Sequence, residues 1–263
     1  MAKARVGDVM NPSSVSVSPS DLVTRARKVM RSTGLHTLPV VAEGRLEGII
    51  TIREILRVTS TRSNIPVSGL MLPPQLAVVP EDDLIQLSKK IIALDVPLAP
   101  VIRSPSDRTL VGLVRLEGLL NYLAGGPAPD LTVRDVMSRN VVTCDPEDGI
   151  LKVWARMEET GFSGIPVTRY NRQKHREEVI GMVTRMDVIK SGAIRPVQES
   201  GKGRNPPVES IMRTPPITIS PDAKLKRAVS LMARRRIGRL PVVERGAFVG
   251  IVDREDVIKP YLG

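Results

Sequence analysis

The chain has 263 residues and a formal net charge of +11, from 39 Lys and Arg against 28 Asp and Glu. One cysteine and two histidines exclude a disulfide scaffold, a thiolate metal cage and a histidine-rich metal site. No apolar signal core or 18-residue apolar run is present, so the sequence predicts a soluble cytoplasmic protein that does not enter a membrane. The basic excess is uneven, since residues 1–132 carry 15 basic and 12 acidic side chains and residues 133–263 carry 24 and 16.

One sequence pattern occurs four times along the chain. Each copy opens on a segment that starts with Val and ends four residues later with Met, and closes on a glycine that precedes Glu, Asp or Gly by six residues. The opening segments begin at Val6, Val67, Val133 and Val208. The closing glycines, spaced 64, 69 and 69 residues apart, are Gly48, Gly112, Gly181 and Gly250. The sequence therefore predicts a fold built from repeats.

The fourth copy shows most clearly how one repeat is built. Its expected elements are a strand at 217–220, a helix from Pro221, a hairpin of strands 240–243 and 248–252, and a final helix from Asp253 to Lys259. Leu225, Ala228, Val229 and Met232 form the apolar stripe of the longer helix. A unit of this size buries too little surface alone, so we expect the repeats to pair.

Linker composition indicates how the repeats pair. The repeats, at 6–56, 67–120, 133–189 and 208–259, are joined by a short stretch at 57–66 and by a Gly- and Pro-rich stretch at 191–207. A third stretch with Gly125, Gly126 and Pro127 separates the two pairs. We therefore expect one domain at 1–126 and another at 127–263.

The repeats resemble the cystathionine-β-synthase (CBS) domain family. The resemblance rests on the opening segments, the closing pattern and the strands Leu38-Pro-Val40, Ile165-Pro-Val167 and Leu240-Pro-Val242. It implies an α/β (α+β) fold in which four β-α-β-β-α repeats pair into two Bateman modules. These would form a disc-like, pseudo-symmetric assembly similar to the gamma subunit of the AMP-activated kinase.

The closing patterns could be structural, functional or both. Each places a cap residue three positions before an acid, in the pairs Thr51 and Glu54, Thr184 and Asp187, and Asp253 and Asp256. This spacing is that of a helix capping box. The resemblance adds a ligand, because the family's acid binds ribose hydroxyls and its Thr meets a phosphate. Asp253 would repel a phosphate, whereas repeat two has Arg115 and Gly118 and cannot bind a ribose in this way.

The resemblance also implies an adenine site along the Pro-Val strands. It assigns backbone and apolar contacts to Gly164, Ile165, Pro166, Leu240 and Thr143, and phosphate contacts to His36 and Arg239. For the apolar residues, ordinary core packing is the alternative. For His36 and Arg239, the alternative is a plain surface role.

Basic residues gather in the second half of the chain. They lie in an expected hairpin turn, a linker and one helix: Arg169, Arg172, Lys174, Arg176, Lys202, Arg204, Lys224, Arg227, Arg234, Arg235 and Arg236. Such clusters favour nucleic-acid phosphates, although a solvated face is the alternative. Aromatic residues make up 2% of the chain, which disfavours stacking on single strands and favours structured RNA, the ribosome surface or duplex nucleic acid.

The sequence contains none of the familiar catalytic motifs, so we expect a protein that is not an enzyme. The first hypothesis is a sensor of adenine nucleotides (AMP, ADP or ATP), without a metal cofactor, that regulates binding to RNA or the ribosome and thereby translation. The second is a regulatory subunit of an enzyme, kinase or transporter, with the charge incidental. A DNA-binding repressor is a weaker third hypothesis, and a homodimer remains open.

Overall fold

The computed structural model describes residues 4–12, 15–58, 65–94, 96, 98–192 and 205–262. They form two compact units, of residues 1–128 with 258–263 and of residues 129–257. The mixture of helices and small antiparallel sheets confirms the expected fold class.

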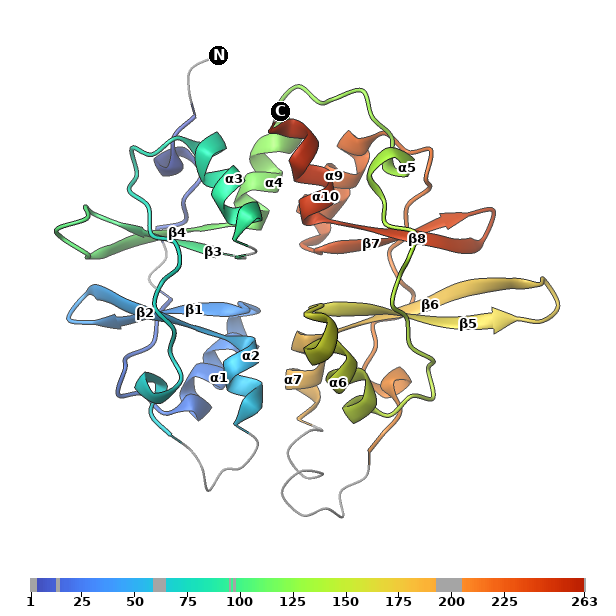
Figure 1. The fold of residues 1–263 in the computed structure, drawn as a ribbon, viewed down its shortest axis with the longest axis horizontal. Coiled ribbons are helices and arrows are strands. Elements are labelled where there is room, and N and C mark those ends of the chain that lie inside the picture. The colour runs from blue at the N-terminus through green and yellow to red at the C-terminus, as the bar shows by residue number, and fades with distance from the viewer. Residues whose placement is uncertain are drawn as a thin grey trace. The chain divides into compact units, whose positions relative to one another are not determined.

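Unit 1 contains repeats one and two (Figure 1). Repeat one comprises η1 (Val6–Asp8), α1 (Val23–Thr33), β1 (Thr37–Ala42), β2 (Arg45–Thr51) and α2 (Ile52–Arg57). Repeat two comprises η3 (Val67–Gly69), α3 (Leu84–Ala93), β3 (Leu98–Ile102), β4 (Leu110–Arg115) and α4 (Leu116–Gly125). The hairpins β1–β2 and β3–β4 lie next to each other, with the helices of each repeat on the outer side.

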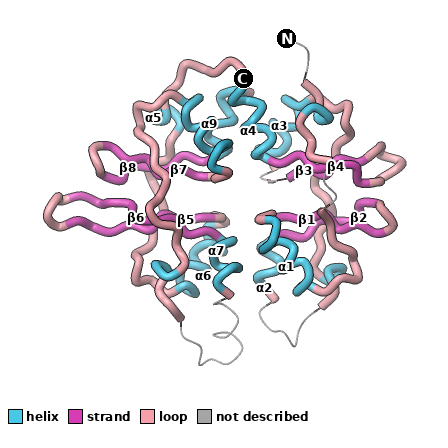
Figure 2. The backbone as a smooth tube through the Cα atoms, turned by 180° about the vertical axis from the view of Figure 1, so that it is seen from behind, coloured by secondary structure: helices cyan, strands magenta, loops and turns pink. Residues whose placement is uncertain are grey.

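Unit 2 repeats this plan. Repeat three comprises α5 (Val133–Val136), α6 (Ile150–Thr160), β5 (Gly164–Asn171), β6 (Arg176–Thr184) and α7 (Arg185–Ser191). Repeat four comprises η4 (Val208–Ser210), α9 (Leu225–Arg235), β7 (Arg239–Glu244), β8 (Ala247–Asp253) and α10 (Arg254–Ile258). The final η5 (Lys259–Tyr261) is assigned to unit 1. Within unit 2, β6 contacts β8, and Figure 2 shows the two hairpins as neighbours.

The core lies between each hairpin and its helices. Along the Pro-Val strands, Leu38, Val40, Ile165 and Val167 are completely buried. The predicted stripe of α9 is confirmed, because Leu225, Ala228, Val229 and Met232 are also completely buried. Each hairpin shifts register directly after the valine of its Pro-Val pair.

Two expected elements differ from the structure. The opening strand of each repeat is reduced to one parallel bridge to the Pro-Val strand, for example from Ile219 to Val242, because the chain leaves the sheet after one residue pair. The long helix of repeat four begins at Leu225 with Lys224 as its N-cap, not at Pro221. Pro221 and Asp222 instead belong to the turn that precedes it.

The opening segments are exchanged between paired repeats. Val6 and Gly7 donate backbone hydrogen bonds to Asp82 and Pro80 of repeat two, and Val67 donates to Asp21 of repeat one. Just beyond each opening methionine, one residue pairs with the hairpin of the other repeat: Asn11 with Leu113, Leu72 with Ile49, Ser138 with Ile251 and Arg213 with Met182. Each opening segment therefore pairs with the sheet of the neighbouring repeat rather than with the sheet of its own repeat. A repeat is complete only together with its partner in the pair.

The exchange also explains the closing glycines. In every pair the opening methionine packs on the closing glycine of the other repeat, with its sulfur 2.5 to 3.3 Å from where a β-carbon would be. The pairs are Met10 with Gly112, Met71 with Gly48, Met137 with Gly250 and Met212 with Gly181. The opening methionine and the closing glycine therefore recur together, because the methionine sulfur packs where a larger residue than glycine would place its β-carbon.

Candidate ligand-binding site

The closing pattern of repeat three forms a complete capping box at the start of α7. The Thr184 backbone N–H and hydroxyl both donate to Asp187 Oδ2, at 2.9 and 2.5 Å. The Asp187 N–H donates back to the Thr184 hydroxyl at 3.2 Å. Thr184 and Asp187 therefore form the helix capping box that their spacing in the sequence predicts.

A capping box alone does not identify a ligand site in this chain. Thr132 and Asp135 form the same box at the start of α5, with both donor distances at 2.7 Å. The Thr132 backbone N–H and hydroxyl lower the pKa of Asp135, which is exposed. Asp187 differs because its side chain is 8% exposed and because a second group approaches it.

That second group is Arg213, from the segment that repeat four contributes to the sheet of repeat three. Its Nε lies 3.1 Å from Asp187 Oδ1, and its side chain is 58% exposed. The Arg213 backbone exchanges hydrogen bonds with Met182, which holds the segment beside β6. Both carboxylate oxygens of Asp187 therefore have partners within the protein.

A second arginine of repeat four reaches the same region. Arg239, the first residue of β7, donates from Nη1 to the Ser163 hydroxyl at 2.6 Å. The same nitrogen lies 3.6 Å from where a β-carbon of Gly164 would be, and Gly164 pairs with Thr184 across the β5–β6 hairpin. Arg213 and Arg239 thus bring two positive charges from repeat four to the closing residues of repeat three.

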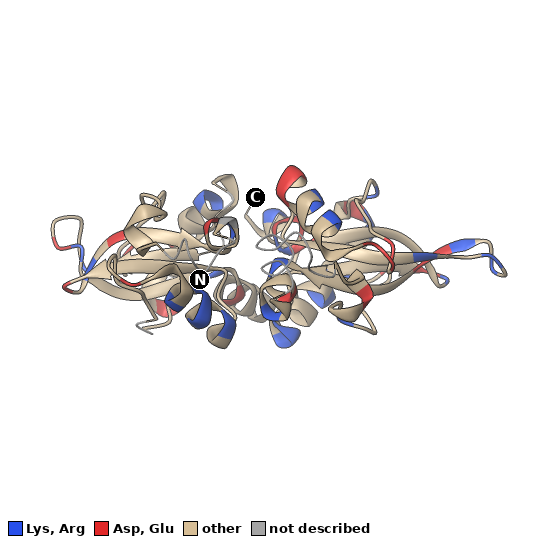
Figure 3. Cartoon of the chain, turned by 90° about the horizontal axis from the view of Figure 1, so that it is seen from below, with Lys and Arg blue, Asp and Glu red and all other residues tan. Residues whose placement is uncertain are grey.

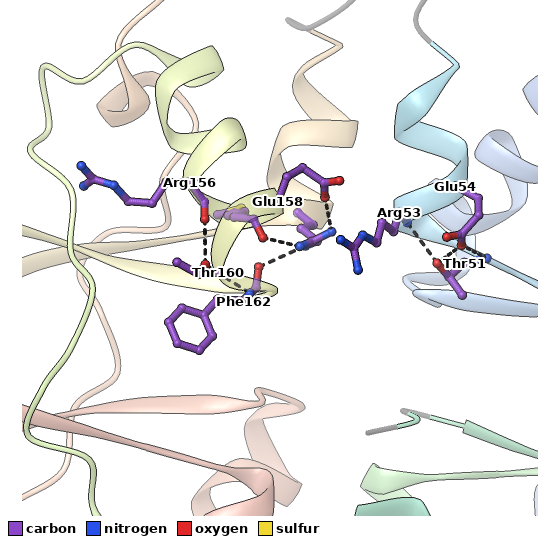
Figure 4. A network of polar contacts seen from close by, with 9 residues as sticks. Thr51, Arg53, Glu54, Arg156, Glu158, Thr160 and Phe162 are labelled. Carbon is purple, nitrogen blue, oxygen red and sulfur yellow. Dashed lines mark hydrogen bonds and ion pairs between the residues drawn. The ribbon is translucent and has the colours of Figure 1, made fainter. Parts of the chain in front are cut away.

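The other closing patterns are built differently. In repeat one, Thr51 donates to Glu54 Oε2 from both N–H and hydroxyl, and Glu54 is buried (Figure 4). In repeat four, Asp253 accepts from the N–H groups of Glu255 and Asp256, at 2.9 and 3.1 Å. The carboxylate of Asp253 therefore serves as the helix cap.

Repeat two has no acid at this place. A β-carbon on Gly118 would lie 3.3 Å from the Val9 carbonyl oxygen, so the backbone of the exchanged segment occupies the space beside it. Arg115, at the cap position, makes no side-chain cap hydrogen bond.

The residues of the predicted adenine site along the Pro-Val strands are largely buried. Ile165 and Leu240 are completely buried, as the core-packing alternative predicts for their side chains. Gly164 and Pro166 are buried too, whereas Thr143 is half-buried and accepts from Arg156 at 2.6 Å through its carbonyl. His36 is half-buried, and its carbonyl accepts from Ile52, just as that of Ser163 accepts from Arg185.

The sequence motifs did not predict a role for Arg185, which lies between Thr184 and Asp187 in sequence. This arginine is 3% exposed and lies over the ring of Trp154, 5.4 Å from its centroid. Its guanidinium donates to Glu158 and to the carbonyls of Met157 and Phe162, so it ties α7 to the end of α6. Figure 4 shows Glu158 and Phe162 beside this network. No short-range sequence signal marks this role, because the partners are 23 to 28 residues away.

Within the described part of the chain, four of the eleven predicted nucleic-acid-binding residues are paired with acids. Arg169 pairs with Glu147, Lys174 and Arg176 pair with Glu178, and Lys224 pairs with Asp130. Figure 3 shows positions of Lys and Arg interspersed with positions of Asp and Glu on the ribbon. Arg172, Arg227, Arg234, Arg235 and Arg236 are exposed, and Arg234 donates to the Ser230 carbonyl. Lys202 and Arg204 lie outside the described residues.

Half of the expected basic hairpin turn is strand. β5 continues through Asn171 and β6 starts at Arg176, which leaves a turn of residues 172–175. Arg169 is therefore a strand residue, because Tyr170 and Glu177 extend the ladder. The hairpin is longer than the other three because its strands have eight and nine residues, whereas the others have five to seven.

Neither a metal-binding cluster nor a membrane-spanning helix is present among the described residues. No group of three His, Cys, Asp or Glu there could hold a metal ion. Among the same residues, no helix has the length and apolar character needed to cross a membrane.

Comparisons with known proteins agree with the repeat structure. The model of the CBS domain matches residues 6–60, 133–193 and 208–263. Protein MJ1404 of Methanocaldococcus jannaschii is 27% identical over 98% of the chain, which spans 62% of that protein's length. Protein MJ1225 of the same organism is 24% identical over 95% of this chain and 96% of its own.

Solved structures share the fold. The crystal structure of MJ1225, described as a proposed archaeal homologue of g-AMPK, superposes with a TM-score of 0.84 at 22% identity and covers 98% of this chain and 100% of that one. An uncharacterised conserved protein from Pyrococcus horikoshii has a TM-score of 0.67 at 20% identity, over 99% of this chain and 100% of that one.

Proposed function

Since the chain belongs to the CBS domain family, we propose that it is a non-enzymatic regulator that binds an adenine nucleotide at the closing residues of repeat three. The observation that carries this proposal is the convergence of a buried acid, Asp187, with Thr184, Arg213 and Arg239 from two paired repeats. The carboxylate suits the ribose hydroxyls, and the arginines suit phosphate. We infer that residues 1–126 and 127–263 are two Bateman modules and that the second holds this site.

The remaining repeats contribute less to this proposal. Asp256, with Asp253, Arg239 and Leu240, would form a site that disfavours phosphate, and Thr51, Glu54 and His36 would form one in unit 1. AMP, ADP and ATP are the ligands to compare. A ligand that binds one arrangement of the repeats better than another shifts the population toward it, which is how binding would reach a partner.

Calorimetric titration of the full chain with AMP, ADP and ATP tests the proposal. We expect binding of at least one nucleotide to the wild-type protein and a loss of about tenfold or more in Asp187→Asn, which keeps the side-chain shape but removes the charge. Asp135→Asn is the matched control, since it alters the same capping box on α5. No heat with any nucleotide would end the proposal.

The output of this regulator would be binding to a polyanion, most concretely structured RNA or the ribosome. The net charge of +11 and the exposed arginines Arg172, Arg235 and Arg236 support this part. The acid partners of Arg169, Lys174, Arg176 and Lys224 favour the second candidate, a regulatory subunit of a protein partner. Capture from a nuclease-treated lysate separates the two, because only a protein partner survives the treatment.

A further inference from the structure

The ion pair between Arg213 and Asp187 occupies the acid that the proposed nucleotide needs. One carboxylate oxygen, Oδ2, is held by the capping box, and the other, Oδ1, faces Arg213 at 3.1 Å. A ribose hydroxyl that donates to Oδ1 competes with the Arg213 guanidinium for this oxygen, because the Asp187 side chain is 8% exposed and leaves little room for both donors. Arg213 can move at little cost, because its side chain is 58% exposed and an exposed partner is weakly held.

This arrangement is particular to repeat three. The residue after each opening methionine pairs with the neighbouring hairpin, and these residues are Asn11, Leu72, Ser138 and Arg213. Arg213 alone of these four is charged. Its backbone remains fixed to Met182 when the side chain swings, so the charge stays within one side-chain length of Asp187.

Resting on the proposed function, we propose that Arg213 is a displaceable latch that makes the repeat-three site select phosphorylated adenosine over adenosine itself. In the ligand-free protein the guanidinium neutralises Asp187. When the ribose takes Oδ1, the guanidinium is released and pairs with the phosphate. Arg239, held by Ser163 at 2.6 Å, adds a second positive charge to the same region. Adenosine displaces the same ion pair but offers no anion in return.

The two roles of Arg213 predict opposite effects of its removal. Arg213→Ala frees Asp187, so adenosine affinity should rise about two- to fivefold, the equivalent of an exposed ion pair. The same change removes a charge-assisted contact to phosphate worth about tenfold, so AMP affinity should fall by about two- to fivefold once the same gain at Asp187 is included. The preference for AMP over adenosine therefore falls by about tenfold, the worth of the phosphate contact, because both ligands gain equally from the freed Asp187.

The test is calorimetric titration of wild type and Arg213→Ala with AMP and with adenosine. Arg103→Ala is the matched control, because Arg103 is also an exposed arginine in an ion pair, with Asp107 at 2.8 Å, on the β3–β4 turn of unit 1. An unchanged preference in Arg213→Ala, or tighter binding of both ligands, overturns the latch. Wild-type protein that binds neither ligand overturns the proposed function together with the latch, so the two failures are distinguishable.

Discussion

The carbonyl oxygen of Ser138 lies 2.7 Å from where a β-carbon on Gly250 would be. Ser138 belongs to the segment exchanged from repeat three, and its backbone exchanges two hydrogen bonds of 2.9 Å with Ile251, the neighbour of Gly250. The close approach of these two backbones holds the pair of repeats together, and a side chain at residue 250 would force them apart.

We therefore expect Gly250→Ala to destabilise unit 2 by about 1–3 kcal/mol through overpacking. Denaturant unfolding of the purified variant measures this loss. Gly125→Ala is the control, since nothing lies within 4 Å of a β-carbon there, and it should be neutral or slightly stabilising. If both variants unfold at the wild-type midpoint, the exchanged segment is not packed as described.

Arg185 should be required for stability rather than for binding. Arg185→Met removes a buried guanidinium and leaves Glu158 and the carbonyls of Met157 and Phe162 without this donor, at a cost of about 1–3 kcal/mol. The exposed pair of Arg103 and Asp107 provides the comparison, because Arg103→Met should cost well under about 1 kcal/mol. Thermal unfolding of both variants decides the matter, and equal melting temperatures would contradict the structural role of Arg185.

Cys144 should be unreactive in the folded protein. Burial raises the pKa of its thiol to about 12, and the sulfur faces the Pro166 carbonyl at 3.7 Å. An exposed thiol ionises near a pKa of about 8.5, so above that pH only the unfolded state loses the proton, and stability falls as pH rises. Alkylation by iodoacetamide at about pH 8.5 should be slow in the native protein and fast in denaturant. Equal rates would show that the thiol is accessible.

We expect Arg236 to lower the stability of the fold and to strengthen the binding of structured RNA. It ends α9 in a left-handed conformation, with φ of 53°, where the helices of repeats one and three end on Gly34 and Gly161. Arg236→Gly should stabilise the protein by about 1 kcal/mol, since glycine adopts this conformation without strain.

The same variant should bind structured RNA more weakly and lower the slope of log affinity against log salt by up to about 0.9, one phosphate contact. Arg235→Gln, on the last turn of the same helix, should share the weaker binding but not the added stability. RNA binding of Arg236→Gly that equals wild type at every salt concentration would argue against a polyanion contact at this helix end.

The sequence predicted the parts of the fold that depend on neighbouring residues. The Thr184–Asp187 box spans three residues, and the hairpin of repeat four follows from alternating apolar residues with a short turn between them. Both are local patterns, so spacing alone was sufficient to predict them.

What the sequence could not predict depends on contacts between repeats. The pattern marks Met212 and Gly181 as recurring residues, but it does not show that an opening segment pairs with the hairpin of the other repeat. The approach of Arg213 to Asp187, 26 residues away, follows from that exchange. The buried position of Arg185 likewise depends on the packing of α6 against α7, which leaves no periodic trace in the sequence.

The most direct test of the nucleotide site is a crystal structure of the full chain grown with AMP. We expect the ribose hydroxyls to lie within hydrogen-bond distance of Asp187, with Arg213 swung off Oδ1 toward the phosphate. A crystal saturated with AMP in which the Arg213–Asp187 ion pair is intact and the nucleotide is bound elsewhere would contradict the account.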